Sequence, residues 1–351
     1  MSETSPATPV QYHDIFSRAR REIANVIIGQ DRVIEQLLAA VFAGGHVLLR
    51  GMPGLGRTLL VKTLAKVLGL EYRRIQFTPD LLPSDIVGAE VLEHSAVTGE
   101  RRFRFHKGPV FANLLLADEI NRSPTRTQNA LLEVMQERQV TAGGQTHFLP
   151  QPFVLIATEN TLDTEGVFRL GEAHLDRFLM MIDQGYPTQE EEKTMLAATT
   201  GMIGHSCQQV TGPAEIMAMQ RLAREVPVVP SVRAFALAIA RSSRPGEIGA
   251  LPEIAKSVRL GASPRATQGM LLAGKVMALA RGRGHVTRQD IIDVAKPVMV
   301  HRILVAFRAA AAGAGPRQIL SRLIENASQT VAGKMSRWTR ELLKQATEDS
   351  I

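Results

Sequence analysis

Three short apolar runs, each followed at once by glycine or polar residues, set the pattern of the first half of the chain. The runs occupy residues 47–49, 114–117 and 153–157. Runs that are apolar at every position predict strands buried on both faces, which is typical of a parallel sheet covered by helices. Because ligands bind such sheets at the carboxyl ends of the strands, the residues after each run are candidate site residues.

Helical periodicity separates these runs. Asp31 is a candidate cap for a helix whose apolar positions over 33–41 share one face, and the pattern ends at Gly44. A second helix has its apolar face over 61–68 and ends at Gly69. The alternation of buried strands and amphipathic helices predicts an α/β core.

The character of the chain changes after Tyr186, where the pattern becomes helical. Thr188 with Glu191 forms a capping box. Pro264 starts another helix, and a last one over 287–297 begins at a further capping box and is expected to stop near its proline. We therefore predict four parts: a flexible N-terminus at 1–14, a nucleotide-binding core at 15–186, a helical lid at 187–330 and a C-terminal tail at 331–351.

Length and composition agree with a two-domain globular protein. The chain has 351 residues, of which 45% are hydrophobic and 21% charged. No apolar run approaches the roughly 20 residues of a membrane helix, and the polar start lacks the features of a signal peptide. Cys207 is the only cysteine, which excludes an internal disulfide and fits a cytoplasmic location.

Charge and histidine spacing narrow the function classes. No two of the nine histidines stand three or four residues apart, so a zinc site built from protein ligands is disfavoured. The net charge of +7 arises in the second half, since residues 1–186 sum to −2 and residues 187–351 to +9. Because these basic residues are scattered without interleaved aromatics, nucleic acid is a disfavoured partner.

The first apolar run leads into a glycine-rich turn, GMPGLGRT at 51–58, with a helical pattern beyond it. Such a loop bends so that its N–H groups point at phosphate oxygens, and the helix N-terminus adds its partial positive charge. Thr58 offers a hydroxyl to Mg²⁺. Arg57 stands where a phosphate loop has lysine, and arginine keeps the charge but not the slim shape.

The second apolar run ends in Asp118-Glu119. Asp118 can hold Mg²⁺ through water, and Glu119 can orient and polarise the attacking water. The predicted nucleotide-binding residues are Gly51, Met52, Pro53, Gly54, Leu55, Gly56, Arg57, Thr58, Leu59 and Asp118, with Thr58 and Asp118 as the Mg²⁺ residues.

These motifs belong to longer stretches that resemble the MoxR family of AAA+ ATPases. The stretches include RIQFTPDLLPSDIVG at 74–88, GPVFANLLLADEINRSPTRTQNALLEVMQERQVT at 108–141, LDRF at 175–178 and VRLGASPRA at 258–266, and the resemblance covers about residues 15–330. It implies an AAA+ P-loop core, with a parallel sheet sandwiched by helices, followed by a smaller all-helical lid. It also implies binding of ATP and ADP with Mg²⁺.

The resemblance implies further roles. Asn160 would be sensor 1, Arg177 the arginine finger that completes the neighbouring subunit's site, and Arg265 sensor 2. Residues 77–110 would hold the helix-2 insert and 139–149 the pre-sensor hairpin, both of which usually face the substrate or the ring pore.

The family works as a ring, usually hexameric, that remodels partner proteins in chaperone-like assembly or metal-insertion tasks. The partners often carry a von Willebrand factor A domain. The expected function is therefore ATP hydrolysis coupled to remodelling of a protein client.

Departures from the family pattern keep two alternatives open. Arg57 replaces lysine, and ATENT at 157–161 stands where the family has ATQNP. Phosphoryl transfer depends on positioning, so one alternative is a scaffold that binds nucleotide without hydrolysing it. A DNA-acting motor of the related helicase branch is ranked last.

Overall fold

The computed structural model describes residues 8–94, 101–160, 167–200, 206–247, 250 and 252–329. It divides into two compact units, which are described separately. The first comprises residues 1–225 with 279–283, and the second residues 226–278 with 284–351. Among the described residues, no helix is both long and apolar enough to cross a membrane.

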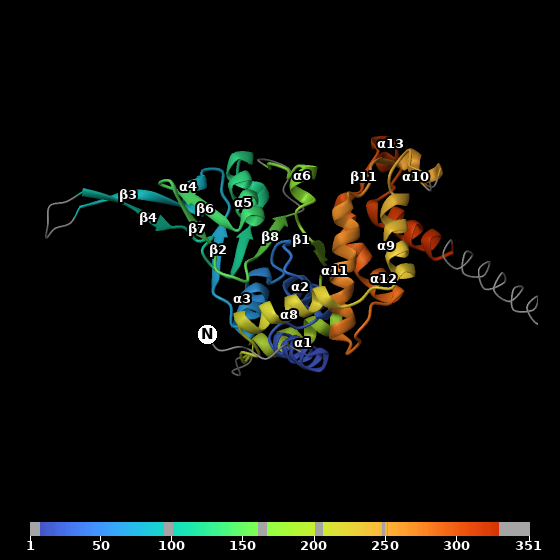
Figure 1. Ribbon diagram of the computed structural model, residues 1–351, viewed down its shortest axis with the longest axis horizontal. Coiled ribbons are helices and arrows are strands. Elements are labelled where there is room, and N and C mark those ends of the chain that lie inside the picture. Colours follow the sequence, from blue (N-terminus) through green and yellow to red (C-terminus); the bar gives the residue numbers. More distant parts are fainter. Residues whose placement is uncertain are drawn as a thin grey trace, which may run out of the picture. The chain divides into compact units, whose positions relative to one another are not determined.

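A five-stranded parallel sheet forms the centre of the first unit (Figure 1). Its strand order is β2-β5-β8-β1-β9, so strands distant in the sequence lie side by side. The three predicted apolar runs are β1, β5 and β8. β5 is buried from Leu114 to Ala117 and β8 from Val154 to Ala157, which confirms that both faces are covered. The strands are β1 (Val47–Gly51), β2 (Tyr72–Gln76), β5 (Leu114–Asp118), β8 (Val154–Asn160) and β9 (Met180–Gln184).

Helices pack around this sheet. α2 contacts β9, and α3 contacts β5. Gly44, in the left-handed conformation, ends α2 as predicted, although Gln30 rather than Asp31 occupies its cap position. The helices of the first unit are α1 (Pro9–Ala24), α2 (Asp31–Ala43), α3 (Arg57–Val67), α4 (Pro83–Val87), η1 (Ile120–Arg122), α5 (Thr125–Glu137), α6 (Glu172–Leu175), α7 (Gln189–Thr200) and α8 (Pro213–Glu225).

The N-terminal segment corrects one prediction. Residues 9–14 were expected to be flexible, but they form the first turns of α1. Thr8 and Gln11 make a capping box at its start, and the Tyr12 side chain is fully buried against Phe42. The predicted flexible residues 1–7 lie outside the described residues, as does the predicted tail at 331–351.

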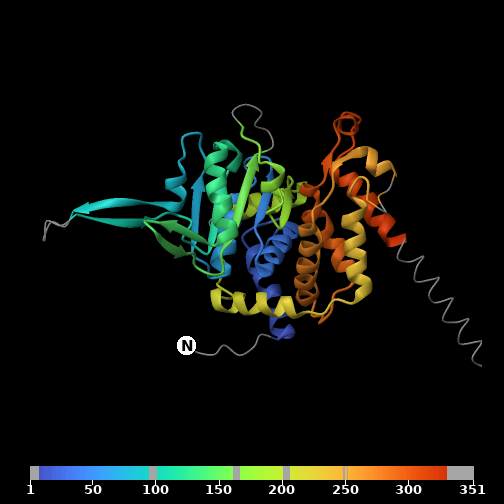
Figure 2. The same cartoon turned by 45° about the horizontal axis from the view of Figure 1, so that its top comes forward.

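Two hairpins extend from the first unit (Figures 1 and 2). β3 (Gly88–His94) pairs antiparallel with β4 (Arg101–Lys107) within the segment expected to hold the helix-2 insert. β6 (Gln139–Ala142) pairs with β7 (Gln145–Phe148), where the pre-sensor hairpin was expected. The two hairpins meet through the rings of Phe105 and His147, which stack with centroids 4.4 Å apart.

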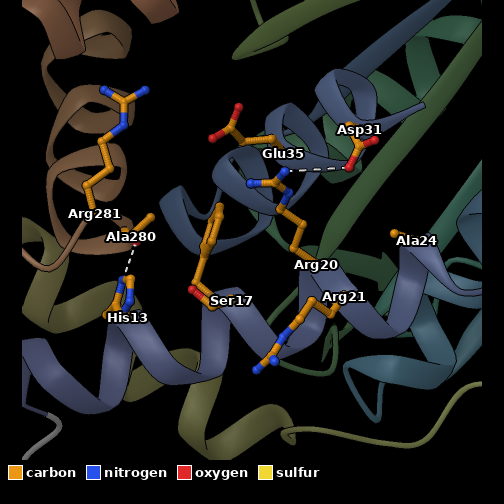
Figure 3. Close-up of a pocket in the computed structure, with 10 residues that line it drawn as sticks. His13, Ser17, Arg20, Arg21, Ala24, Asp31, Glu35, Ala280 and Arg281 are labelled. Atoms are coloured by element: carbon orange, nitrogen blue, oxygen red, sulfur yellow. Dashed lines mark hydrogen bonds and ion pairs between the residues drawn. The ribbon is translucent and has the colours of Figure 1, made fainter. Parts of the chain in front are cut away.

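The first unit extends past the predicted boundary at 186/187. α8 contacts α2, and the Gln220 amide donates to the Val41 carbonyl at 2.8 Å, which holds α8 on the sheet unit. The segment 279–283 also returns to this unit. His13 on α1 lies 2.6 Å through Nδ1 from the Ala280 carbonyl (Figure 3). The contacts of α8 and of residues 279–283 therefore set the boundary of the first unit. The sequence pattern shows only where the chain becomes helical.

Helices and one short ribbon make up the second unit. The capping box of Thr287 and Asp290 is confirmed. The expected stop near Pro297 is confirmed, because α12 ends at Met299, two residues after the proline. The elements are α9 (Pro230–Ser242), α10 (Pro252–Ser257), β10 (Val258–Leu260), α11 (Pro264–Ala280), α12 (Arg288–Met299), η2 (Val300–Arg302), β11 (Leu304–Val305), α13 (Phe307–Ala311) and a helix over 316–329.

Candidate nucleotide site

Strand register brings the predicted site residues of the core to one edge of the sheet. Gly51 at the end of β1 pairs with Asn160 at the end of β8, and Gln76 at the end of β2 pairs with Asp118 at the end of β5. All these strands are parallel, so the glycine loop, both carboxylates and Asn160 follow the same edge. This is the edge at which open α/β sheets bind ligands.

The glycine loop has a preformed backbone. Gly54 and Gly56 have φ of 82° and 70°, in the left-handed region that favours glycine. A Cβ added at either would meet no atom within 4 Å, so the backbone conformation rather than crowding is what favours glycine at these positions. The Gln184 amide of β9 donates to the Leu55 carbonyl at 2.8 Å and fixes the loop from the side.

Arg57 is held at the base of this loop by main-chain carbonyls. Its Nη2 donates to the Met52 carbonyl at 2.9 Å and its Nη1 to the Glu159 carbonyl at 3.3 Å. Burial lowers the pKa of Arg57, and the charges of Asp118 and Glu119 oppose that shift. The guanidinium therefore lies within the field of both carboxylates while bound to the backbone.

Asp118 uses both of its oxygens. Oδ1 accepts from the Thr158 hydroxyl at 2.6 Å, and Oδ2 accepts from Arg74 Nε and Nη2 at 3.0 and 2.7 Å. The Thr158 hydroxyl also accepts from the backbone N–H of Glu119 at 2.8 Å. A single buried hydroxyl on β8 thus holds both residues of the carboxylate pair in place.

Glu119 adopts a backbone conformation that is uncommon for residues other than glycine. Its φ of 57° and ψ of 49° lie in the left-handed region, where sterically costly conformations often mark functional sites. Its Oε2 accepts from the Gln76 amide at 3.0 Å and lies 3.3 Å from Arg122 Nε. The turn directs the carboxylate toward β2 and away from the path of β5.

Glu159 and Asn160 end β8 beside the glycine loop. Asn160 is buried, and its carbonyl accepts from the Asn121 amide at 3.4 Å. Glu159, a departure from the family pattern, pairs with Arg50 at 3.1 Å. Burial raises the pKa of the Glu159 carboxyl, and the charge of Arg50 partly opposes the rise.

Arg177 lies just after α6 and donates through Nη1 to the Leu132 carbonyl of α5 at 2.9 Å. Burial, and then the charge of Arg177, lower the pKa of the nearby His174. The two residues border a shallow hollow of about 390 Å³, lined by Asn129, Glu133, Gln136, Glu137, His174 and Arg177. Arg265 is in the second unit, at the start of α11. The roles of Asn160, Arg177 and Arg265 stay predictions.

Sequence reasoning did not identify three residues of the site. Arg74, Gln76 and Thr158 bind the two carboxylates, but no role was assigned to them. Arg74 and Gln76 alternate along β2, a spacing that places both side chains on one face of the strand. This alternation is the feature of the sequence that could have identified Arg74 and Gln76 as a pair.

The residues present fit a Mg-nucleotide. The glycine loop can take phosphate oxygens on its N–H groups. Thr58, in the first turn of α3, and Asp118 supply the hydroxyl and carboxylate oxygens that Mg²⁺ prefers. Leu59 is half exposed at the same helix start. Bound Mg²⁺ would neutralise phosphate charge, while Glu119 would orient the water.

The fold and the site together define an AAA+ ATPase. The family model described as "ATPase family associated with various cellular activities (AAA)" matches residues 46–180, and the "AAA lid domain" matches 253–323. A crystal structure from Cytophaga hutchinsonii, described as a candidate ATPase, superposes with a TM-score of 0.84 at 37% identity. That match covers 91% of this chain and 96% of the other.

Two curated relatives narrow the class. Chaperone MoxR1 of Mycobacterium tuberculosis is 40% identical over 90% of this chain and 82% of its own length. Protein MoxR of Methylorubrum extorquens is 31% identical over 84% and 89%. The chain belongs to the MoxR family of AAA+ ATPases, as its motifs predicted.

Proposed function

We propose that this chain hydrolyses Mg-ATP with its arginine-bearing phosphate loop and uses the cycle to remodel a partner protein. The observation that supports hydrolysis best is the placement of Glu119. Its left-handed turn and its bond to Gln76 keep a carboxylate beside Asp118, at the edge of the sheet that the glycine loop also follows. General-base assistance by such a carboxylate contributes about 10²- to 10⁴-fold.

We further propose that the active form is a homo-oligomeric ring, expected to be hexameric, in which Arg177 acts on the neighbouring subunit's nucleotide. Arg177 supports this because its hydrogen bond to the Leu132 carbonyl places it beside an open hollow on α5 rather than on the strand edge. A guanidinium supplied in trans stabilises charge in the transition state.

Mixing two inactive variants tests the trans arrangement. Glu119→Gln lacks the carboxylate and Arg177→Ala lacks the finger, so each alone should release little phosphate from ATP. In mixed rings some sites contain Glu119 on one subunit and Arg177 on the next, and we expect activity to reappear. The control mixes Glu119→Gln with wild type under the same conditions. Mixed variants that stay as inactive as either alone would contradict action in trans.

The client is proposed to be a protein, which fits the chaperone name of one relative, and the family resemblance suggests a von Willebrand factor A domain. The β3–β4 hairpin supports such a contact. Leu92 and Phe103 pair across its strands with 48% and 72% of their surfaces exposed, and Arg101 and Arg102 adjoin them. Adjacent exposed apolar side chains, in contrast to single ones, are typical of interaction sites.

One observation favours the alternative of a scaffold that binds nucleotide without turnover. Arg57 donates to two main-chain carbonyls, and these bonds must break before the guanidinium can reach a phosphate. In that case ATP would bind and alter assembly, and phosphate release would appear only in Arg57→Lys. A DNA-acting motor has no comparable support in the site.

A further inference from the structure

Two side chains of β2 connect the two carboxylates of the nucleotide site. Arg74 donates to Asp118 Oδ2 through Nε and Nη2, and its Nη2 also donates to Gln76 Oε1 at 2.5 Å. Gln76 in turn donates from Nε2 to Glu119 Oε2 at 3.0 Å. The result is one continuous chain of hydrogen bonds from Asp118 through Arg74 and Gln76 to Glu119.

The Arg74 guanidinium neutralises the carboxylate that the site offers to Mg²⁺. The Asp118 side chain is 13% exposed, whereas that of Arg74 is 44% exposed, so the arginine has solvent to move into. Mg²⁺ at Asp118 would bring two further positive charges close to the guanidinium. The metal and the guanidinium would repel each other because both are positively charged. A metal bound at Oδ2, directly or through water, would also compete with Arg74 for the same lone pairs.

We infer that Arg74 is a positioning residue that competes with Mg²⁺ for Asp118, so that the wild-type site binds the metal less tightly than it would without the guanidinium. The inference rests on the proposed function, because it concerns metal binding at the same nucleotide site. If Arg74 had only a structural role, its removal would leave the affinity of the site for metal unchanged or would lower it.

The test measures metal affinity rather than turnover. Mn²⁺ binding to the full chain with saturating ADP is followed by electron paramagnetic resonance for the wild type, Arg74→Ala and Arg74→Lys. Removing the competing guanidinium should tighten Mn²⁺ binding by about three- to tenfold, given a charge-assisted bond discounted for exposure. Lysine keeps the charge but not the fork, so Arg74→Lys should fall between the two.

Arg73 provides the matched control. It is the preceding residue on β2, points to the other face, and pairs with Glu71 at 3.1 Å. Arg73→Ala removes the same charge from the same strand and should leave Mn²⁺ affinity at the wild-type value.

Each outcome decides the inference. Unchanged or weaker Mn²⁺ binding in Arg74→Ala overturns it, as does equal tightening in Arg73→Ala. Tighter binding in Arg74→Ala with no phosphate release in the wild type would uphold it while contradicting the proposed hydrolysis. If neither the wild type nor Arg74→Ala gives an ADP-dependent Mn²⁺ signal, both fail.

Discussion

The two ends of the central sheet differ in how their polar groups are satisfied. At the amino end, His46 accepts from the Leu155 N–H at 3.0 Å through Nδ1 and lies 3.2 Å through Nε2 from the Met135 carbonyl. Asn113 donates to the Pro152 carbonyl at 3.1 Å. These side chains are uncharged, buried and bound to backbone atoms, so they fix the amino end of the sheet to the neighbouring segments.

The carboxyl end of the same strands carries charged groups. Asp118 and Glu119 are held by Arg74, Gln76 and Arg122, all side chains that rotamer changes can move. One sheet therefore separates two tasks. Fixed neutral bonds at the amino end maintain the fold, and exchangeable charged bonds at the carboxyl end leave room for a nucleotide and a metal.

Among the variants at either end of the sheet, we expect the largest effect from Glu119→Gln. Losing the carboxylate that orients water should lower ATP turnover by about 100-fold or more, while the amide keeps the size of the side chain. Phosphate release and ATP affinity would both be measured. A loss of ATP affinity as large as the loss of turnover would mean that Glu119 shapes the site rather than the reaction.

Acidification should act at the other end of the sheet. Burial lowers the pKa of His46 to about 4, below the unfolded value of about 6.5. The unfolded state therefore binds more protons below pH 6.5, and the stability that His46 contributes is lost as pH falls toward 4. The free energy of unfolding should fall by up to about 3 kcal/mol across this window.

Denaturant titrations of the wild type and His46→Gln would isolate that contribution, because other groups titrate equally in both. The difference between the two proteins should shrink as pH falls from 6.5 to 4. Parallel pH profiles would show that His46 is not the titrating group.

A smaller effect is expected from Thr158→Val. The hydroxyl donates to Asp118 and accepts from the Glu119 N–H, so its loss leaves both groups less well fixed. An unsatisfied buried group costs about 1–3 kcal/mol, and we expect Mg-ADP affinity to fall about tenfold. Thr158→Ser should retain wild-type affinity in the same titration. Equal weakening by serine would point to packing of the methyl group instead.

Much of the sheet and of the site at its carboxyl end could be predicted from the sequence. The apolar runs gave β1, β5 and β8, and the residues after them gave the loop and the carboxylate pair. β2 was not predicted because Ile75 is the only buried residue of that strand, so no apolar run marks it. Without β2 in register beside β5, the bonds of Arg74 and Gln76 could not be foreseen.

The conformation of Arg57 was also beyond the sequence. The glycine spacing predicted the loop, but the partners of the guanidinium depend on where the carbonyls of Met52 and Glu159 point. The departure from lysine could be read directly, whereas its consequence required the folded loop.

The smallest effect is expected from Arg57→Lys. If the site already accommodates the larger, planar guanidinium, ATP turnover should change by no more than about threefold, because lysine then supplies the same positive charge and its slimmer shape brings no further gain. The measurement is phosphate release at saturating Mg-ATP, with Arg57→Ala as the control that removes the charge. A large gain with lysine would show that arginine limits the reaction.

Steady-state phosphate release by the wild-type chain tests the central claim most directly, namely that this arginine-bearing site hydrolyses ATP. We expect release that requires Mg²⁺ and disappears in Glu119→Gln. No release from a wild-type protein that still binds ATP, with turnover appearing in Arg57→Lys, would contradict the account and make the protein a nucleotide-gated scaffold.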